Sequence, residues 1–468
     1  MEPFSDVSQL CQSLKGVIGV KPGGKIVLLV PSMFRGELVD RLVRTVVFGG
    51  HPRLKKIAAF ILRAAALQNG IWFDSIHKFY MECATGKIKP LTVPAFNIRG
   101  LTFHTARMLF RAARRKQAGV FIFELAPTEM NYTDQNPLEF SSCVIGAALR
   151  EQYSGPVFVQ GDHFKYDSKR YEENSAAETK WLSDLILECI DAGFFNIDCD
   201  GSGLVDLSQP TIELQQKPNV DFMMTFINLI RGSEPESITM AIGGEIGEIG
   251  KELSTVEELR GFMNSLNQRL HTGKIKPGIC KISVQVGSTH GGVVDHDGQI
   301  KKVEIDQKRL KELSETARSE FHLSGGVMHG ASTLPRDVFS FFPESHTIEI
   351  HLGTGLQNIL FDHEMFPSGL HEEIHSHLEI HHAKERKKDW SDDQFYYKLR
   401  KKAWGPFKKA IWSLDERTKQ VILTDIENEF LFFIDQLAVS GTEKLIKKLY
   451  PSAPEIPLTT PSELLKQS

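Results

Sequence analysis

Short apolar segments alternate with longer amphipathic segments through the middle of the chain. Eight apolar runs, often rich in β-branched residues, occupy residues 91–97, 120–126, 157–163, 196–200, 238–247, 279–290, 325–330 and 347–353. Segments with helical periodicity separate them, at residues 103–117, 137–153, 177–192, 212–231, 256–270 and 307–319. A short strand followed by a helix is the repeating unit of a parallel α/β protein. The pattern therefore predicts eight βα units.

Eight such units are the number that closes into a (β/α)8 TIM barrel. An open, doubly wound sheet is the alternative, but no G-x-G-x-x-G motif follows the first apolar run. We therefore expect an α/β fold, a (β/α)8 TIM barrel with helical segments added at both ends.

The barrel is expected to span residues 89–365, between two extensions. Residues 1–88 contain one short apolar run, at 25–31, and helical patterns at 35–48 and 54–69, which indicate a mostly helical N-terminal extension. Residues 366–468 are charged and helical, and end in a proline-containing tail that we expect to be loosely ordered. Two basic clusters, at 384–388 and 398–402, suit either a solvated helix face or the binding of phosphate or nucleic acid.

Composition narrows the classes of function. With 468 residues, of which 41% are hydrophobic and 24% charged, the chain excludes a disordered, fibrous or small disulfide-stapled protein. A formal net charge of −4 argues against a nucleic-acid partner, and no apolar run reaches the about 18 residues that cross a membrane. The six cysteines form no C-x-x-C pair and the first residues lack a signal-peptide pattern, so we expect a reduced, cytoplasmic protein.

Polar residues gather where the predicted strands end. Histidines stand at three of these ends, as His163, His290 and His329. Because the carboxyl ends of barrel strands form one rim, where active sites lie, we expect the three imidazoles to meet. Three imidazoles and an open position make a catalytic zinc site, although each histidine alone also suits a structural or solvent-facing position.

Two carboxylates, Asp200 and Glu245, stand on intervening strand ends. They suit either a second divalent cation or the orientation of the histidines through hydrogen bonds. Asp198 shares a strand face with Asp200 by the period of two, so the residues alone leave the choice between these two aspartates open.

Short motifs along the barrel occur in an order and at a spacing that a known family shares. They are Pro94-Ala95-Phe96-Asn97, Gly161-Asp162-His163, Glu245-Ile246-Gly247, Gly287-x-x-His290-Gly291 and His329-Gly330-Ala331-Ser332. With these motifs, residues from about 90 to 360 resemble the class II, metal-dependent fructose-bisphosphate aldolases. The resemblance implies reversible aldol cleavage of a phosphorylated ketose. Fructose 1,6-bisphosphate is the first expectation, with dihydroxyacetone phosphate and glyceraldehyde 3-phosphate as products of this glycolytic reaction.

The resemblance also implies the metal chemistry of the site. A zinc ion on His163, His290 and His329 would act as a Lewis acid on the ketose carbonyl. Asp200 and Glu245 match the alternative metal site of the family, and Asp200 is preferred to Asp198 because Asp200-Gly201-Ser202 fits without a gap. A second divalent site, a monovalent cation and a homodimer are further expectations from the family.

Two carboxylates receive proton-transfer roles from the same resemblance. Asp162, next to a metal ligand, would donate a proton to the aldehyde oxygen in the condensation direction. Glu252 follows the fifth strand in a glycine-rich stretch, and would move the substrate proton from a mobile loop.

The chain departs from the family pattern around the phosphate. The family has an Asn-x-Asp-Thr-Asp run after the eighth strand, where this chain has Glu349-Ile350-His351-Leu352-Gly353, and Gln160 and Gly243 replace a histidine and a glutamate usual in the family. We expect the substrate to contact Asn97. We expect its phosphate to lie on backbone N–H groups, at Gly291, Gly330, Ala331, Ser332, Gly353 and Thr354.

Three alternatives remain open. His371-Glu372-x-x-His375 matches the zinc-protease helix motif, although the further histidines, lysines and acids that follow it favour a solvated histidine-rich helix. Lys281 would form a Schiff base with a ketose if the enzyme worked without zinc, but it lies early in its strand and also suits a structural or surface position. Some barrels related to tagatose-bisphosphate aldolases support a catalytic partner, and such a role is the third alternative.

Overall fold

Eight parallel strands close into a barrel in the computed structural model, which describes residues 1–21, 25–247, 253–288, 294–297 and 304–465. The strands are β4 (Val93–Asn97), β5 (Ile122–Leu125), β6 (Gly155–Phe164), β7 (Asn196–Cys199), β8 (Ala241–Glu245), β9 (Lys281–Ser283), β10 (Gly326–Met328) and β11 (Thr347–Leu352). Each pairs in parallel with the next in chain order, and β11 pairs with β4. The predicted (β/α)8 barrel is therefore confirmed.

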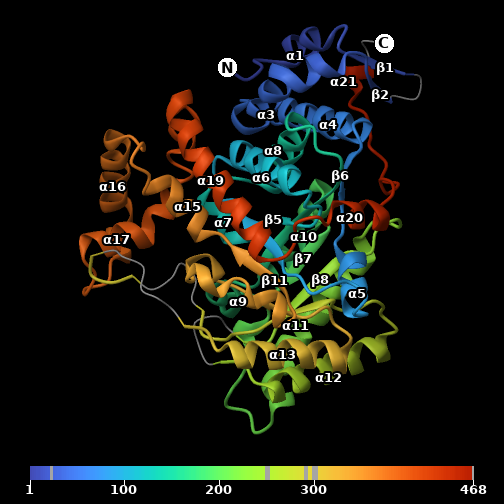
Figure 1. The fold of residues 1–468 in the computed structure, drawn as a ribbon, viewed down its shortest axis with the longest axis vertical. Helices are drawn as coiled ribbons and strands as arrows, with labels where there is room; N and C mark the ends of the chain where they lie inside the picture. The colour runs from blue at the N-terminus through green and yellow to red at the C-terminus, as the bar shows by residue number, and fades with distance from the viewer. Residues whose placement is uncertain (22–24, 248–252, 289–293, 298–303, 466–468) are drawn as a thin grey trace.

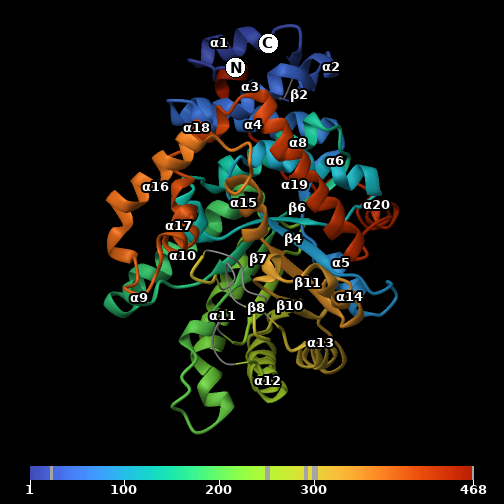
Figure 2. The ribbon, with the colours of Figure 1, turned by 60° about the vertical axis from the view of Figure 1, so that its left-hand side comes forward.

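Helices surround the barrel, as Figures 1 and 2 show. The principal ones are α6 (Thr102–Lys116), α8 (Pro137–Arg150), α10 (Ser175–Ala192), α11 (Ile212–Ser233), α12 (Val256–Gly273), α13 (Gln307–Phe321) and α15 (Thr354–Phe361). Short helices α7 (Pro127–Tyr132), α9 (Ser168–Glu173) and α14 (Phe341–Glu344) lie in the connections. Side-chain caps begin several of them: Asn136 accepts from the backbone of Glu139, and Thr255 forms a capping box with Glu258.

Strand β6 carries an irregularity that places a site residue. Its pairing with β7 shifts register between Gly161 and Phe164, and His163, inside this stretch, has a φ of 47°. A side chain at Gly161 would meet the Phe164 ring at 2.3 Å, so the position needs glycine. The bulge turns His163 out of the regular alternation of the strand, which is a common use of bulges beside active sites.

The N-terminal extension packs on the outside of the barrel helices. It contains α1 (Val7–Leu14), the hairpin β1 (Ile18–Val20) and β2 (Ile26–Leu28), α2 (Pro31–Met33), α3 (Val39–Phe48), α4 (Pro52–Gln68), β3 (Ile71–Asp74) and α5 (His77–Ala84). Helices α3 and α4 lie against α8 (Figure 1), closely enough that a side chain at Gly146 would meet Val43 at 2.4 Å. Strand β3, which the helical interpretation of this segment does not include, pairs with the first half of β6.

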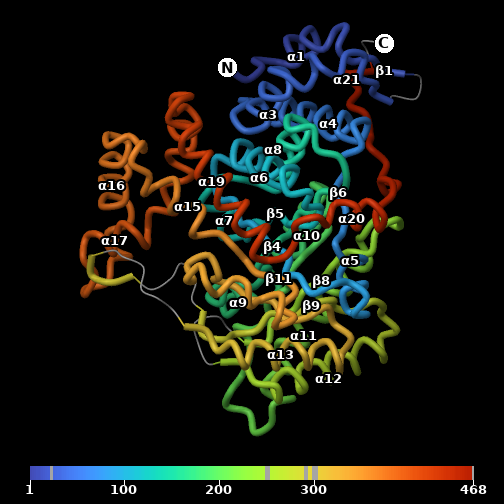
Figure 3. The backbone as a smooth tube through the Cα atoms, in the orientation of Figure 1, coloured from blue at the N-terminus to red at the C-terminus, as the bar shows by residue number. Residues whose placement is uncertain are grey.

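The C-terminal extension covers another part of the barrel and then returns to the N-terminal helices. Its helices are α16 (Ser368–His382), α17 (Asp392–Leu399), α18 (Lys408–Trp412), α19 (Glu416–Gln436), α20 (Glu443–Leu449) and α21 (Ser462–Leu465). Helix α19 packs along α6. The backbone trace of Figure 3 follows the tail back to the N-terminal helices, where Glu463 forms an ion pair with Arg53 at 2.5 Å.

All six cysteines are buried, and none of them is in a disulfide bond. Within the described residues, the helices lack the combination of length and apolar character that a membrane crossing requires.

Candidate active site

A cavity of about 240 Å³ lies at the carboxyl ends of the barrel strands. Residues from β4, β5, β6, β10 and β11, or directly after them, line it, together with one residue of the C-terminal extension, Lys401. Many of the predicted site residues are among its lining residues: Asn97, Asp162, His163, His329, Gly330, Ser332, Gly353 and Thr354. Ala331 is buried beside them in a short 3-10 turn.

His163 lies among two carboxylates and a second imidazole. Its Nδ1 is 3.0 Å from Oδ2 of Asp200 and 3.3 Å from Oε2 of Glu245. The rings of His163 and His329 have their centroids 4.1 Å apart. One potential ligand atom from each of His163, Glu245 and His329 lies within 4.8 Å of the other two. This group brings together three of the residues that the sequence analysis assigns to metal binding.

The two candidate aspartates of β7 have different surroundings. Asp200 accepts hydrogen bonds from the backbone and hydroxyl of Ser202, at 3.1 and 2.5 Å, and pairs with Lys165 at 3.2 Å. Asp198 pairs instead with Lys281, at 2.9 Å. Asp200 is therefore the aspartate that orients His163.

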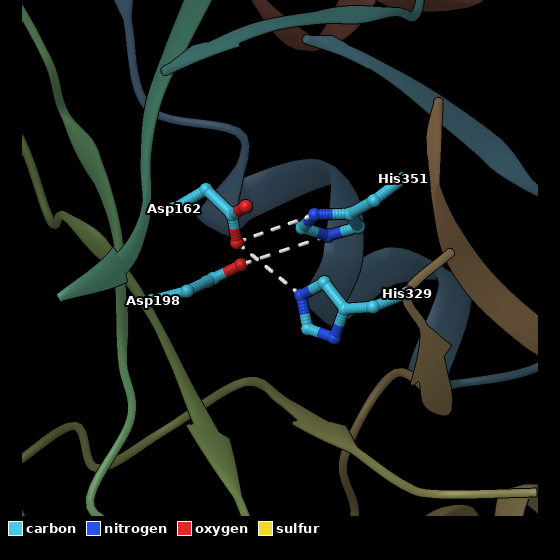
Figure 4. A group of neighbouring side chains, drawn as sticks. All are labelled: Asp162, Asp198, His329 and His351. Atoms are coloured by element: carbon cyan, nitrogen blue, oxygen red, sulfur yellow. Dashed lines mark hydrogen bonds and ion pairs between the residues drawn. The ribbon is translucent and has the colours of Figure 1, made fainter. Parts of the chain in front are cut away.

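Asp162 lies between two imidazoles, as Figure 4 shows. Its Oδ1 is 3.2 Å from Nε2 of His329 and 3.3 Å from Nδ1 of His351. The rings of His329 and His351 are 4.0 Å apart. Asp162 is thus held at the wall of the cavity by a side chain of β11 and by the side chain of the residue that follows β10.

His351, which in the sequence stands out only as a departure from the family pattern, is a full member of the site. It lines the cavity and contacts Glu124 at 2.9 Å and Glu349 at 2.7 Å. The available signal is its position two residues after Glu349, because alternate residues of a strand share one face. Both side chains point into the barrel.

The site holds an excess of carboxylates over fixed cations. Around the imidazoles, six carboxylates stand against the two lysines that pair with them, Lys165 and Lys281. All six are almost completely buried: Glu124, Asp162, Asp198, Asp200, Glu245 and Glu349. Burial and the charge of Asp200 raise the pKa of Glu245 to about 7. Burial opposes ionisation of Asp200, but its hydrogen bond with His163 and the charge of Lys165 outweigh burial and lower its pKa. Such a donor set suits a bound divalent cation.

The pKa values of His163 and His329 are shifted in opposite directions by their surroundings. Burial disfavours the charged form of both His163 and His329. For His163 the charges of Asp162 and Glu245 outweigh burial and raise its pKa, whereas for His329 the neighbouring imidazoles add to burial and lower its pKa. His329 is thus kept neutral, the form in which an imidazole binds metal.

A second polar network fills the barrel below the cavity. The Lys281 ammonium donates hydrogen bonds to Gln160 at 2.8 Å, Asp198 at 2.9 Å and Glu349 at 2.6 Å, and the Tyr80 hydroxyl donates to Glu349. Burial opposes the charge on Lys281, but the two carboxylates outweigh it and raise its pKa. A protonated amine is a poor nucleophile, so this network does not favour the Schiff-base alternative. Lys281 is a structural lysine, as its sequence position allowed, but it is buried and not on the surface.

Asn97 is held at the edge of the cavity. Its Nδ2 donates to Oε2 of Glu129 at 2.6 Å, and its Oδ1 accepts from Nε of Arg99 at 3.1 Å. Three of the predicted site residues, Glu252, His290 and Gly291, lie outside the described residues. Their roles stay predictions.

The histidine-rich helix α16 lies apart from this site. His371 packs against the Tyr396 ring at 4.5 Å, and His375 stacks on the same ring at 5.8 Å. Among the described residues, the groups of three or more potential metal ligands all lie in the barrel, and none includes His371 or His375. The contacts therefore favour a packed and solvated helix at this motif.

The chain is similar to known proteins in sequence and in fold. The family model described as class-II fructose-bisphosphate aldolase matches residues 83–408. Among solved structures, the fructuronate-tagaturonate epimerase UxaE of Cohnella laeviribosi is similar with a TM-score of 0.54 and 11% identity, covering 93% of this chain and 91% of that one. The fructose-bisphosphate aldolase of Campylobacter jejuni is similar with a TM-score of 0.46 and 15% identity, over 80% of this chain and 96% of that one. No protein with a curated description matches the chain.

Proposed function

The chain belongs to the class II fructose-bisphosphate aldolase family, and on this premise we propose that it is a zinc-dependent lyase that cleaves and forms a C–C bond of a phosphorylated ketose. Fructose 1,6-bisphosphate, giving dihydroxyacetone phosphate and glyceraldehyde 3-phosphate, is the first substrate to test. One observation carries the proposal. His163, Glu245 and His329 bring potential ligand atoms within 4.8 Å of one another, beside Asp162 and a cavity at the barrel mouth.

The residues present suit a zinc ion. Two imidazoles and a carboxylate are ligands that zinc accepts, and the surplus of buried carboxylates favours a cation. His163 and His329 would hold the ion, with His290 as the expected third imidazole and Glu245 as a further ligand. When bound, zinc supplies Lewis-acid polarisation of a ketose carbonyl. Asp200 fixes the orientation of the His163 ring through its 3.0 Å contact with Nδ1.

Asp162 is the group that we assign to proton transfer. Burial opposes its ionisation, but the charges of His163 and His351 outweigh burial and lower its pKa, so Asp162 is ionised, which is the form that can accept a proton. In the cleavage direction it takes the proton of the substrate hydroxyl as the C–C bond breaks. In the condensation direction it returns that proton to the aldehyde oxygen. The contacts with His329 and His351 keep its oxygen at the cavity wall.

The test is elemental analysis of the purified protein together with coupled assays on a panel of ketose phosphates. We expect bound zinc, release of a triose phosphate from at least one substrate, and loss of this activity with a chelator. Activity that resists the chelator would contradict the proposal. Metal-loaded protein that cleaves no ketose phosphate alone, but activates a partner, would favour the partner-supporting role instead.

A second candidate is epimerisation, the reaction named for the Cohnella laeviribosi structure. The observation that favours it is the position of His351, which lines the cavity beside Asp162 and is a second group able to exchange protons there. Cleavage followed by re-addition of the aldehyde to its other face would invert one hydroxyl-bearing carbon. Nuclear magnetic resonance of the sugar pool distinguishes cleavage from epimerisation. Epimerisation yields an epimer of the substrate without free aldehyde, whereas cleavage releases the aldehyde.

A further inference from the structure

The basic cluster at residues 398–402 does not behave as one surface. Arg400, Lys401 and Lys402 are consecutive residues of a short 3-10 helix, Arg400–Ala403. Arg400 is paired with Asp362, at 2.8 Å between Nη2 and Oδ2, and Lys402 is paired with Glu385 at 2.6 Å. Lys401, between them, is the one of the three that lines the active-site cavity.

Within the described part of the chain, the Lys401 amine forms neither an ion pair nor a hydrogen bond, although the Glu129 carboxylate lies near enough to act on its charge. Its Nζ lies 5.8 Å from the centre of the Tyr132 ring, which also borders the cavity. Partial burial at the cavity mouth and the charge of Arg99 lower the pKa of Lys401. An anion in the cavity would relieve this repulsion.

Arg99 supplies a second, more rigid cation on the same cavity wall. Its Nε lies 3.0 Å from Oε1 of Glu129, and its Nη1 donates to the Thr354 hydroxyl at 3.4 Å. Its side chain is only 15% exposed. A side chain at Gly353 would meet Nη2 of Arg99 at 2.9 Å, so glycine at this position leaves room for the guanidinium. Glu129 balances one of the two positive charges and leaves the other for a ligand.

We propose that Lys401 and Arg99 form the subsite for the anionic end of the sugar substrate, a phosphate or a carboxylate. The inference rests on the proposed function and extends it. It assigns recognition of this end to the C-terminal extension and to the residue two places after β4, in a chain whose eighth strand lacks the family's phosphate-binding run. The substrate class is therefore an anionic ketose, and Lys401 is a specificity-determining residue and not part of the bond-breaking machinery.

The test compares Lys401→Met with Lys402→Met, a matched control one residue away whose amine is already paired with Glu385. Initial rates of the zinc-loaded, full-length protein are measured on a ketose phosphate, a ketose with a carboxylate and an uncharged ketose. Because a hydrogen bond to a charged group is lost, we expect Lys401→Met to raise KM for the anionic substrate by about 10- to 100-fold, with kcat nearly unchanged. KM for the uncharged ketose should stay within about twofold, and Lys401→Arg should restore most of the loss.

The three substrates also identify the anion. A loss confined to the ketose phosphate assigns the subsite to phosphate, and a loss confined to the other acid assigns it to carboxylate. An equal change on charged and uncharged substrates, or no change at all, would overturn the proposal. Lys402→Met is expected to behave as the wild type on all three.

A measurement without turnover separates this inference from the proposed function. Lys401 and Lys402 are acetylated with acetic anhydride in the presence of inorganic phosphate, and each site is quantified by mass spectrometry. Protection of Lys401 but not of Lys402 supports the subsite even if no ketose is cleaved. If anionic ketoses are cleaved, but phosphate does not protect Lys401 and Lys401→Met does not change KM, the results contradict the subsite and not the lyase function. If no ketose is cleaved and phosphate does not protect Lys401, the results contradict both the lyase function and the subsite.

Discussion

His163 and His329 lie ring beside ring, with centroids 4.1 Å apart and planes tilted by 30°. One ring comes from the bulge of β6 and the other from the residue that follows β10, so the closed barrel brings together side chains from distant parts of the sequence. Buried rings with their nitrogens directed at carboxylates are expensive unless a cation or a proton balances the charge. The pair is therefore the first place to test the proposed metal centre.

Replacing either imidazole should remove the metal and the activity together. His329→Ala deletes one ligand and leaves Asp162 without one of its two imidazole contacts, so we expect zinc content near zero and no measurable cleavage. Elemental analysis after gel filtration measures the first quantity and a coupled assay the second. His371→Ala on α16 is the control, because that ring packs on Tyr396 and outside the cavity. Full zinc content in His329→Ala would contradict the assigned ligand.

Asp162→Asn should separate chemistry from metal binding. The amide keeps the shape of the side chain but cannot accept the substrate proton, so we expect kcat to fall by about 100- to 10,000-fold while the zinc content stays at the wild-type level. Loss of zinc from this variant would show that Asp162 serves the metal and not the proton. Steady-state kinetics and elemental analysis on one preparation give both answers.

Lys281→Met should destabilise the barrel. The amine neutralises Asp198 and Glu349 inside the barrel, and its removal leaves two buried carboxylates without their counter-charge. Breaking a buried ion pair in this way costs about 3–5 kcal/mol, which should appear as a large drop in thermal midpoint. Lys180→Met, which breaks an exposed pair with Asp184 on α10, is the control and should change stability by less than about 0.5 kcal/mol.

The pairing of Lys281 also bears on the Schiff-base alternative. Wild-type protein treated with borohydride in the presence of a ketose should keep its activity, because the Lys281 amine is protonated and enclosed by three hydrogen-bond acceptors. Inactivation by borohydride, with a mass increase on Lys281, would contradict this prediction.

The barrel was predictable from sequence because its signal is local. Apolar runs and amphipathic segments repeat along the chain, and strand ends identify the rim where His163 and His329 stand. The surroundings of Asp198 and Asp200 were not predictable, because a period of two gives them one face and the pairing with Lys281 or His163 depends on strands far away in sequence. His351 shares that limit. The sequence shows that His351 alternates with Glu349. It does not show which face of β11 points into the barrel, because that depends on how the barrel closes.

In the two terminal extensions, local sequence patterns do not predict strand β3 or the role of Lys401. Strand β3 is short and pairs only with β6, so its role depends on a partner more than eighty residues away. Lys401 stands in a basic cluster whose members look alike in sequence. Asp362 and Glu385, which separate Arg400 and Lys402 from it, come from other segments of the fold.

A last prediction concerns the pH dependence of stability at the contact between the barrel and the C-terminal extension. His104 on α6 packs edge-on against Trp412 of α18, with centroids 5.0 Å apart, and its Nδ1 lacks a hydrogen-bond partner within the described residues. Burial, together with the charges of Lys419 and Arg107, lowers its pKa to about 3. In the unfolded chain a histidine takes up its proton near pH 6.5.

The unfolded state therefore binds more protons than the folded state below about pH 6.5, and the stability that neutral His104 contributes is lost as the pH falls from there towards 3. Between pH 7 and pH 5 this group alone should cost about 2 kcal/mol. His104→Leu should remove that loss, so that the difference in thermal midpoint between variant and wild type grows in the variant's favour as the pH falls. His271→Leu, at an exposed position near the end of α12, is the control and should keep the wild-type dependence. Parallel midpoint curves for His104→Leu and wild type from pH 7 to pH 5 would show that His104 is not held neutral in the folded protein.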